Sequence, residues 1–86
     1  MKETILITGA SSGIGKETAK FFHSKGWNVV ATMRNPEKEA ELNTMKNILV
    51  TKLDVLDVAS IKEAIEKGIQ KFGGIDVLLN NAGYGA

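Results

Sequence analysis

Four short apolar runs recur along the chain, at residues 5–7, 29–31, 48–50 and 77–79. Each run is a continuous stretch of Ile, Leu, Val or Ala, without the alternation of apolar and polar positions that marks a half-exposed strand. Continuous runs of this length are typical of strands in a parallel sheet, because helices cover both faces of such a sheet. The pattern therefore predicts four buried parallel strands.

Two amphipathic helices are predicted between these strands. One covers residues 14–25, and the glycine at position 26 ends it. The other opens at Asp57 and stops at Gly73, and its apolar residues recur at helical spacing. The face of the first helix that we expect to cover the sheet consists of Ile14, Ala19, Phe21 and Phe22. The recurring apolar residues of the second are Val58, Ile61, Ala64, Ile65, Ile69 and Phe72.

A third and more polar helix is predicted over about residues 36–45, with Asn35 as its N-cap and proline at its first position. Strands and helices then alternate along the whole chain. Such an order predicts a doubly wound parallel sheet joined by right-handed crossovers. We expect the strands in the spatial order 3-2-1-4, with three helices and a ligand crevice between the first and fourth strands.

Composition narrows the class of protein. The chain has 86 residues, which suits one small domain over residues 1–86 and no more. The net charge is +1 with acids and bases interspersed, so neither nucleic acid nor a membrane surface is an expected partner. The chain has no cysteine, no cluster with metal-ligand spacing and no apolar stretch long enough to span a bilayer. We expect a cytoplasmic protein without a metal site.

A glycine-rich loop follows the first predicted strand and reads TGASSGIG over residues 8–15. Gly9 allows a tight turn out of the strand, Gly13 leaves room for phosphates to approach the backbone, and Gly15 allows close packing of the helix. The N–H groups at the start of the helix then attract a pyrophosphate. The loop therefore predicts a dinucleotide site.

A phosphate-loop NTPase is the competing interpretation of this loop, since residues 10–17 read ASSGIGKE. That motif needs a glycine where this chain has Ala10 and a magnesium-binding hydroxyl where it has Glu17. A carboxylate at the second position would oppose bound phosphate. We therefore favour the dinucleotide.

The pattern T-G-x-x-x-G-I-G after a first strand resembles the cofactor loop of the short-chain dehydrogenase/reductase family. Asn80, Asn81, Ala82 and Gly83 resemble the NNAG motif that follows the fourth strand in that family. The resemblance implies a Rossmann-type, NAD(P)-binding domain that is only the first part of the parent enzyme. It also implies hydride transfer between the cofactor and a small carbonyl or alcohol substrate, and we expect the parent to be a homo-oligomer.

The end of the second strand bears on the choice between NADP(H) and NAD(H). Dinucleotide folds that select NAD place an acid there to bind the ribose 2′-hydroxyl, but this chain has Met33 and then Arg34. A guanidinium suits a 2′-phosphate by its charge and its fork of donors. We therefore favour NADP(H) over NAD(H), and we expect the hydroxyls of Thr32 and Ser11 to add contacts to the same phosphate.

Further contacts to the cofactor are implied by the resemblance. Asp54 would accept a hydrogen bond from the adenine amino group, with Val55 beside the ring. A turn aspartate that bonds the local backbone is the alternative for Asp54. Asn81 would lie against the adenosine ribose, whereas Asn80 would pin the sheet. The expected cofactor-binding residues are Gly9, Ser11, Ser12, Gly13, Ile14, Gly15, Arg34, Asp54, Val55, Asn81, Ala82 and Gly83.

The catalytic residues of the family are not expected among these 86 positions. The resemblance implies a serine and a Y-x-x-x-K motif, in which tyrosine moves the proton and lysine lowers the tyrosine pKa. Tyr84 is the only tyrosine, and position 88, where the lysine would stand, is not in the sequence. A stand-alone nucleotide-binding or sensing module without catalysis remains the alternative function.

Overall fold

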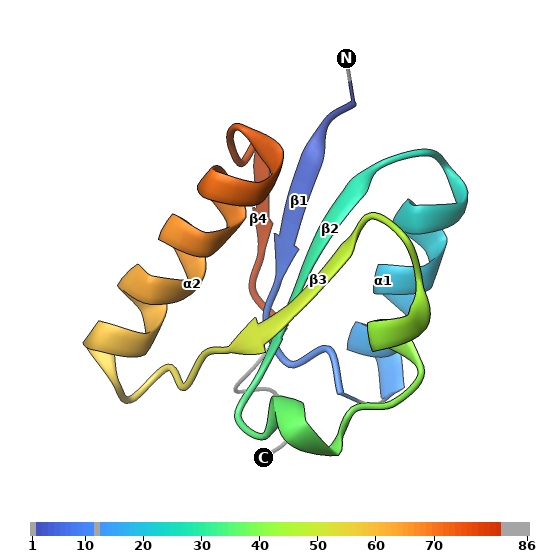
Figure 1. Ribbon diagram of the computed structural model, residues 1–86. Helices are drawn as coiled ribbons and strands as arrows, with labels where there is room; N and C mark the ends of the chain where they lie inside the picture. The colour runs from blue at the N-terminus through green and yellow to red at the C-terminus, as the bar shows by residue number, and fades with distance from the viewer. Residues whose placement is uncertain (1, 12, 82–86) are drawn as a thin grey trace.

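The computed structural model describes residues 2–11 and 13–81 of the chain. Ser12, Ala82, Gly83 and Tyr84 therefore lie outside the described residues, together with the expectations placed on them. Figure 1 shows strands and helices in alternation, with short 3-10 turns between the second and third strands. The elements are β1 (Thr4–Ile7), α1 (Gly13–Ser24), β2 (Asn28–Met33), η1 (Pro36–Lys38), η2 (Leu42–Thr44), β3 (Ile48–Lys52), α2 (Val58–Phe72) and β4 (Val77–Leu79).

The four strands form one parallel sheet in the order β3-β2-β1-β4, as the sequence predicts. Thr4 of β1 lies opposite Asn28 of β2, and Ile5 lies opposite Val77 of β4. Both neighbours of β1 come from distant parts of the sequence, because each parallel pairing needs a crossover. The carboxyl ends of β1, β2 and β4 meet at one edge of the sheet.

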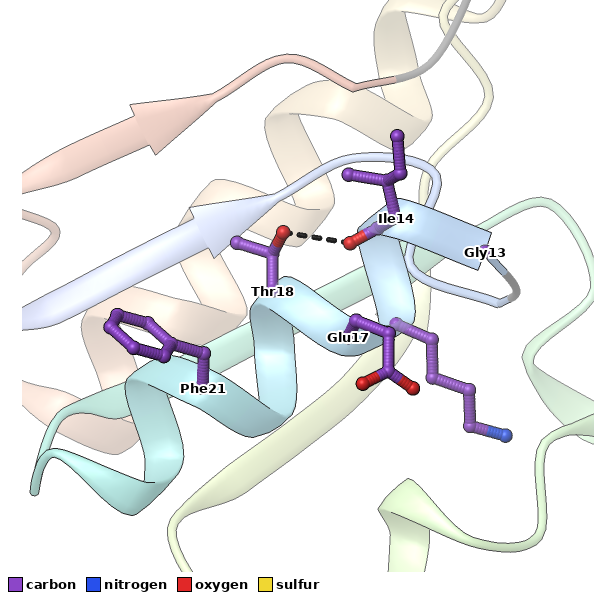
Figure 2. Close-up of a pocket in the computed structure, with 6 residues that line it drawn as sticks. Gly13, Ile14, Glu17, Thr18 and Phe21 are labelled. Atoms are coloured by element: carbon purple, nitrogen blue, oxygen red, sulfur yellow. Dashed lines mark hydrogen bonds between the residues drawn. The ribbon is translucent and has the colours of Figure 1, made fainter.

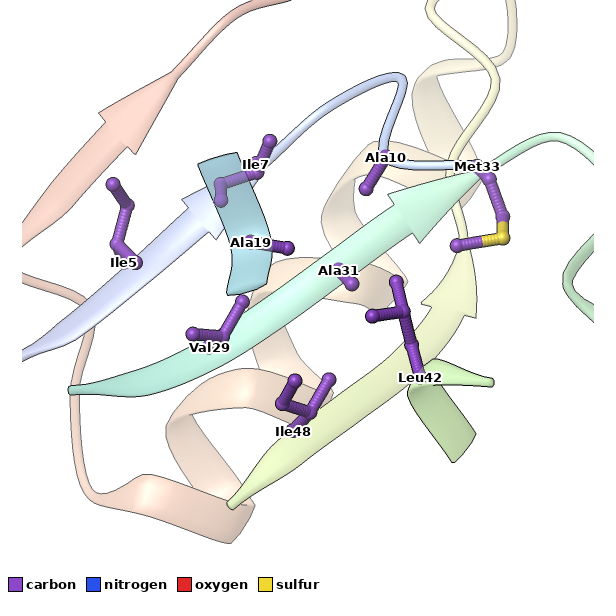
Figure 3. Packing of buried hydrophobic residues seen from close by; sticks show 9 residues of the cluster. All are labelled: Ile5, Ile7, Ala10, Ala19, Val29, Ala31, Met33, Leu42 and Ile48. Atoms are coloured by element: carbon purple, nitrogen blue, oxygen red, sulfur yellow. The ribbon is translucent and has the colours of Figure 1, made fainter. Parts of the chain in front are cut away.

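Helices cover both faces of this sheet, α1 with η2 on one side and α2 on the other (Figure 1). Successive side chains of a strand point to opposite faces, so Ile5 and Ile7 of β1 belong to one core and Leu6 to the other. The core under α1 contains Ile5, Ile7, Ala10, Ala19, Val29, Ala31, Met33, Leu42 and Ile48 (Figure 3). This double burial explains why β1 and β2 read as continuous apolar runs. The predicted burial of the fourth strand is wrong among the described residues, because no helix or further strand there covers Val77, Leu78 and Leu79 of β4, which are all exposed.

Both ends of α2 follow from local chemistry that the sequence predicts. The Asp57 side chain accepts a hydrogen bond from Ala59 N at 3.1 Å and so caps the first turn. Gly73 has a φ of 90° and donates its N–H to Ile69 O at 2.7 Å, which closes the last turn in the left-handed conformation. Neither α1 nor α2, the two α-helices of the described residues, is long and apolar enough to cross a membrane.

The helix predicted over residues 36–45 is wrong, because that segment forms the two 3-10 turns η1 and η2. Asn35 makes no side-chain cap. Leu42 is the one residue of the two turns that is buried, so no apolar stripe holds a helix on the sheet. The Asn43 side chain donates to Glu39 O at 2.6 Å instead, a local bond that competes with helix formation. Residues 2–11 and 13–81 therefore contain two α-helices instead of the predicted three.

The predicted sheet-facing side of α1 is correct for Ala19 and Phe22 but wrong for Ile14 and Phe21. Ala19 is fully buried and Phe22 packs on the core, whereas Ile14 is 76% exposed and Phe21 is 55% exposed. Only a narrow strip of α1 touches the sheet, because the helix lies over β1 and β2 and leaves its outer side uncovered among the described residues.

Candidate functional site

The loop from Thr8 to Gly15 connects β1 to α1 at the carboxyl edge of the sheet. Thr8 N donates to Leu79 O of β4 at 3.0 Å, and Ala10 N donates to Thr32 O of β2 at 3.0 Å. The loop is therefore fixed to the strands on both sides of β1. Gly9 has a φ of 66° and Gly13 a φ of 59°, conformations that glycine adopts without a steric penalty.

Glycine at position 15 is required by a close backbone approach. A Cβ atom there would lie 2.0 Å from Gly9 O and 2.7 Å from Asn81 Nδ2. The close packing predicted for Gly15 is thus present, and its partner is the loop itself. A Cβ on Gly13 would meet nothing within 4 Å, so the backbone there is open to an approaching ligand.

The segment after β4 is tied to the same loop through Thr8. The Thr8 hydroxyl donates to Asn80 Oδ1 at 2.9 Å and accepts from Asn81 N at 2.8 Å. The Asn81 side chain donates from Nδ2 to Gly9 O at 3.2 Å. Asn80 therefore joins two strands, as expected, and Asn81 supports the glycine loop from the side. The sequence motif contained Thr8, but its bridging role was missed.

The start of α1 has the features of an anion site. The first N–H groups of an α-helix have no partner within the helix and carry a partial positive charge. No acidic residue lies in the first turn of α1. Ser11 is exposed beside this turn and Ile14 projects into solvent. With Gly13 open, these features fit a pyrophosphate at the helix terminus.

Arg34 is placed at the same edge, directly after β2. Its side chain is exposed and forms no hydrogen bond or ion pair with any residue in 2–11 or 13–81. The bond between Ala10 N and Thr32 O brings the glycine loop to within two residues of Arg34 along the chain. The backbone at Arg34 therefore lies near the glycine loop, and its guanidinium has no partner among the described residues.

The contact expected from Thr32 is wrong. Its side chain is fully buried, and its hydroxyl donates to Ile7 O of β1 at 2.8 Å. Thr32 falls on a strand position that faces the interior, so its hydroxyl needs a partner inside the protein and cannot reach a ligand at the edge. Ser11 is the remaining hydroxyl of the pair predicted to bind the phosphate.

Asp54 uses one of its two carboxylate oxygens as a turn aspartate does, to bond the local backbone. Its Oδ1 accepts from Leu56 N at 3.0 Å, while its backbone N donates to the Ser60 hydroxyl at 2.9 Å. The other carboxylate oxygen has no partner among the described residues. Leu53 N bonds Met33 O at 2.9 Å, so Asp54 and the exposed Val55 lie near Arg34 at the end of the sheet.

Two lysines of α1 form ion pairs with the segment after β2, a network that the sequence did not reveal. Lys16 Nζ lies 3.3 Å from Glu39 and 3.2 Å from Glu41, and Lys20 also pairs with Glu41. The bond to Glu41 is the main cause that raises the pKa of Lys16, and the bond to Lys20 is the main cause that lowers the pKa of Glu41. Spacing gives no signal for contacts between segments this far apart.

A surface hollow of about 660 Å³ lies along the outer side of α1. Figure 2 shows Ile14, Thr18 and Phe21 beside it, with the Thr18 hydroxyl bonded to Ile14 O at 2.7 Å. Only the end formed by Gly13 and Ile14 belongs to the glycine loop. We therefore place the candidate cofactor site at the strand ends and not in this hollow. No cluster of His, Asp or Glu in the described part of the chain is suited to a metal ion.

A parallel sheet of order 3-2-1-4 with a glycine loop at its switch point defines a Rossmann-type domain. The family model described as short chain dehydrogenase matches residues 3–86. An uncharacterized oxidoreductase of Schizosaccharomyces pombe is 40% identical over 82 residues, which are 95% of this chain and 27% of that protein. The chain belongs to the short-chain dehydrogenase family.

Relatives with assigned activities agree with this membership. A 3-oxoacyl-[acyl-carrier-protein] reductase of Thermotoga maritima is 46% identical over 83 residues, 91% of this chain and 34% of the reductase. The crystal structure of a 3-ketoacyl-(acyl-carrier-protein) reductase from Brucella melitensis, complexed with NADH, matches with a TM-score of 0.79 and 34% identity. That match covers 88% of this chain and 32% of the other. The chain thus spans about a third or less of the length of these relatives.

Proposed function

We propose that residues 1–86 are the NADP(H)-binding portion of an oxidoreductase that transfers hydride between NADP(H) and a carbonyl or alcohol substrate. Bound NADP(H) would supply the hydride chemistry, and the described residues would bind and orient it. Family membership supports the reaction class, since relatives of this chain are reductases and oxidoreductases. The substrate class follows the same family resemblance.

Each part of the cofactor has a matching group in this proposal. The pyrophosphate would lie over Gly13 at the start of α1, where the backbone is open and no acid is present in the first turn. The free oxygen of Asp54 would accept from the adenine amino group, and Val55 would flank the ring. Gly9, Gly15 and Asn81 would act by holding the loop in shape.

The preference for the phosphorylated cofactor rests on one observation, the exposed side chain of Arg34, which has no partner among the described residues. Such a cation is available to a 2′-phosphate, and a charge-assisted bidentate contact suits that ligand. The Brucella melitensis complex with NADH supports a dinucleotide in this family without bearing on the phosphate.

Calorimetric titration of the protein with NADPH and NADH tests the proposal. We expect NADPH to bind more tightly, and we expect Arg34→Ala to lower NADPH affinity by roughly ten- to a hundredfold, since charge-assisted hydrogen bonds are worth about 1.5–3 kcal/mol. NADH affinity should change less than threefold, by about 0.7 kcal/mol at most. Lys38→Ala removes a nearby exposed charge and serves as the control. Equal affinity of the unmodified protein for both cofactors would contradict the assignment of Arg34.

We also propose that copies of the isolated 86-residue chain associate through β4. Val77, Leu78 and Leu79 are 41%, 57% and 38% exposed, and β4 pairs only with β1 among the described strands. An exposed apolar edge strand invites pairing with another chain. We expect sedimentation velocity to show concentration-dependent association that Leu78→Lys abolishes and Val58→Lys, an exposed site on α2, does not. A monomer at all concentrations would contradict the proposal.

A further inference from the structure

Glu39 is a buried acid in the segment that follows Arg34. Its side chain is only 4% exposed, and Oε2 accepts from Leu42 N at 2.9 Å and lies 3.3 Å from Lys16 Nζ. A carboxylate this deeply buried needs such partners, because desolvation of an unpaired charge is costly. Leu42 itself is fully buried in the core under α1. Glu39 therefore anchors the segment between β2 and β3 in two ways.

Lys16 connects that anchor to the glycine loop. It directly follows Gly15, so its backbone is part of the first turn of α1 that would hold the pyrophosphate. The segment carrying Arg34 is thus fixed at one end by Met33 of β2 and at the other by the contact between Glu39 and Lys16. The ion pair between Lys16 and Glu39 therefore connects the segment that carries Arg34 to the start of α1.

We propose that Lys16 and Glu39 are positioning residues that hold Arg34 in place for a phosphorylated adenosine ribose and so set the preference for NADP(H) over NAD(H). The inference rests on the proposed function. Neither side chain needs to touch the cofactor. Lys16 acts through Glu39 on the backbone of the segment, and Arg34 makes the contact. Removal of the contact between Lys16 and Glu39 should lower the affinity for NADPH much more than the affinity for NADH.

The test is the ratio of NADPH to NADH affinity, measured by titration of the protein. We expect Lys16→Met to lower this ratio by roughly five- to tenfold, a fraction of what a whole charge-assisted contact provides. Lys20→Met is the matched control, because it removes the same charge from the same helix but leaves Glu39 untouched. It should change the ratio less than about twofold, or about 0.4 kcal/mol.

Two further variants separate positioning from general stability. Glu39→Gln keeps an acceptor for Leu42 N but loses the charge that attracts Lys16, and it should lower the ratio as Lys16→Met does. The double variant should be no worse than Lys16→Met, since Lys16→Met already removes the contact between Lys16 and Glu39. Lys16→Arg should retain the ratio. If the role were purely structural, the variants would lower the affinities for NADPH and NADH equally and would also lower the melting temperature. That result would overturn the proposal.

The outcomes also distinguish this inference from the proposed function. An unmodified protein that binds neither cofactor, or binds both equally, would contradict the proposed function itself. A clear preference for NADPH that depends on Arg34 but survives in Lys16→Met and Glu39→Gln would contradict only the positioning role. Glu39→Gln alone decides the question if Lys16→Met does not fold.

Discussion

Gly15→Ala is expected to destabilise the protein by about 3 kcal/mol or more, at the upper end of what overpacking costs. The added methyl would lie 2.0 Å from Gly9 O and 2.8 Å from the Gly9 carbonyl carbon. Both are backbone atoms, so no rotation of a side chain relieves the clash. Either α1 moves away from the loop or the loop leaves Thr32, and each change breaks the geometry at the carboxyl edge. Dinucleotide affinity should fall by more than roughly tenfold as a result.

Two glycine controls separate the clash from the general effects of replacing glycine. Gly74→Ala adds a methyl where nothing lies within 4 Å and should be close to neutral. Gly13→Ala also meets nothing within 4 Å, but its φ of 59° costs a residue with a Cβ about 1–2 kcal/mol. Urea unfolding followed by circular dichroism measures all three. A Gly15→Ala protein as stable as Gly74→Ala would contradict the close approach of Gly15 to Gly9 O.

The strands could be predicted from the sequence because a strand that is buried on both faces has a continuous run of apolar residues. Leu6 packs under α2 while Ile5 and Ile7 pack under α1, so all three positions had to be apolar. The ends of α2 were equally predictable, since Asp57 and Gly73 act through bonds to residues two to four positions away. Local rules and the burial pattern together determine this part of the fold.

The segment of residues 36–45 was mispredicted because tertiary contacts decide its conformation. Proline after Asn35 indicates a helix start, yet a helix also needs an apolar face, and Leu42 alone does not provide one. Glu39 and Glu41 instead form ion pairs with lysines of α1, Glu39 with Lys16 and Glu41 with both Lys16 and Lys20. Contacts between segments that are more than twenty residues apart leave no periodic signal in the chain.

The candidate site was predictable in its motifs but not in the contacts that hold them. The glycine loop, Arg34 and Asp54 were found from spacing and from resemblance, and they lie at one edge of the sheet as expected. Thr32 could not be separated from Ser11 by residue type, because only the direction of its side chain shows that the hydroxyl bonds Ile7 O. The bridging role of Thr8 could not be predicted either, because it is seen only from the partners that its hydroxyl bonds in the structure.

Thr8→Val is expected to destabilise the protein by about 2–4 kcal/mol, because each buried polar group left without a partner costs about 1–3 kcal/mol. Valine keeps the shape of threonine and replaces the hydroxyl with a methyl group, which forms no hydrogen bonds. Asn80 Oδ1 then loses its donor at 2.9 Å, and Asn81 N loses its acceptor at 2.8 Å. Thr8 is only 5% exposed, so water replaces these bonds poorly. The matched control is Thr18→Val, whose hydroxyl bonds Ile14 O on the exposed side of α1 and should contribute less than about 0.5 kcal/mol.

The same substitution should act on cofactor binding in a way that differs from Arg34→Ala. Thr8 ties the segment after β4 to the glycine loop, and Asn81 in turn bonds Gly9 O. Loosening this junction disturbs the loop that would hold the pyrophosphate, which NADPH and NADH have in common. Thr8→Val should therefore lower the affinities for NADPH and NADH by a similar factor and leave the ratio of the two affinities unchanged. Arg34→Ala, by contrast, should change this ratio. Titration of both cofactors at a temperature where Thr8→Val is folded measures this, and a selective loss of NADPH would show that Thr8 acts on the 2′-phosphate side of the site.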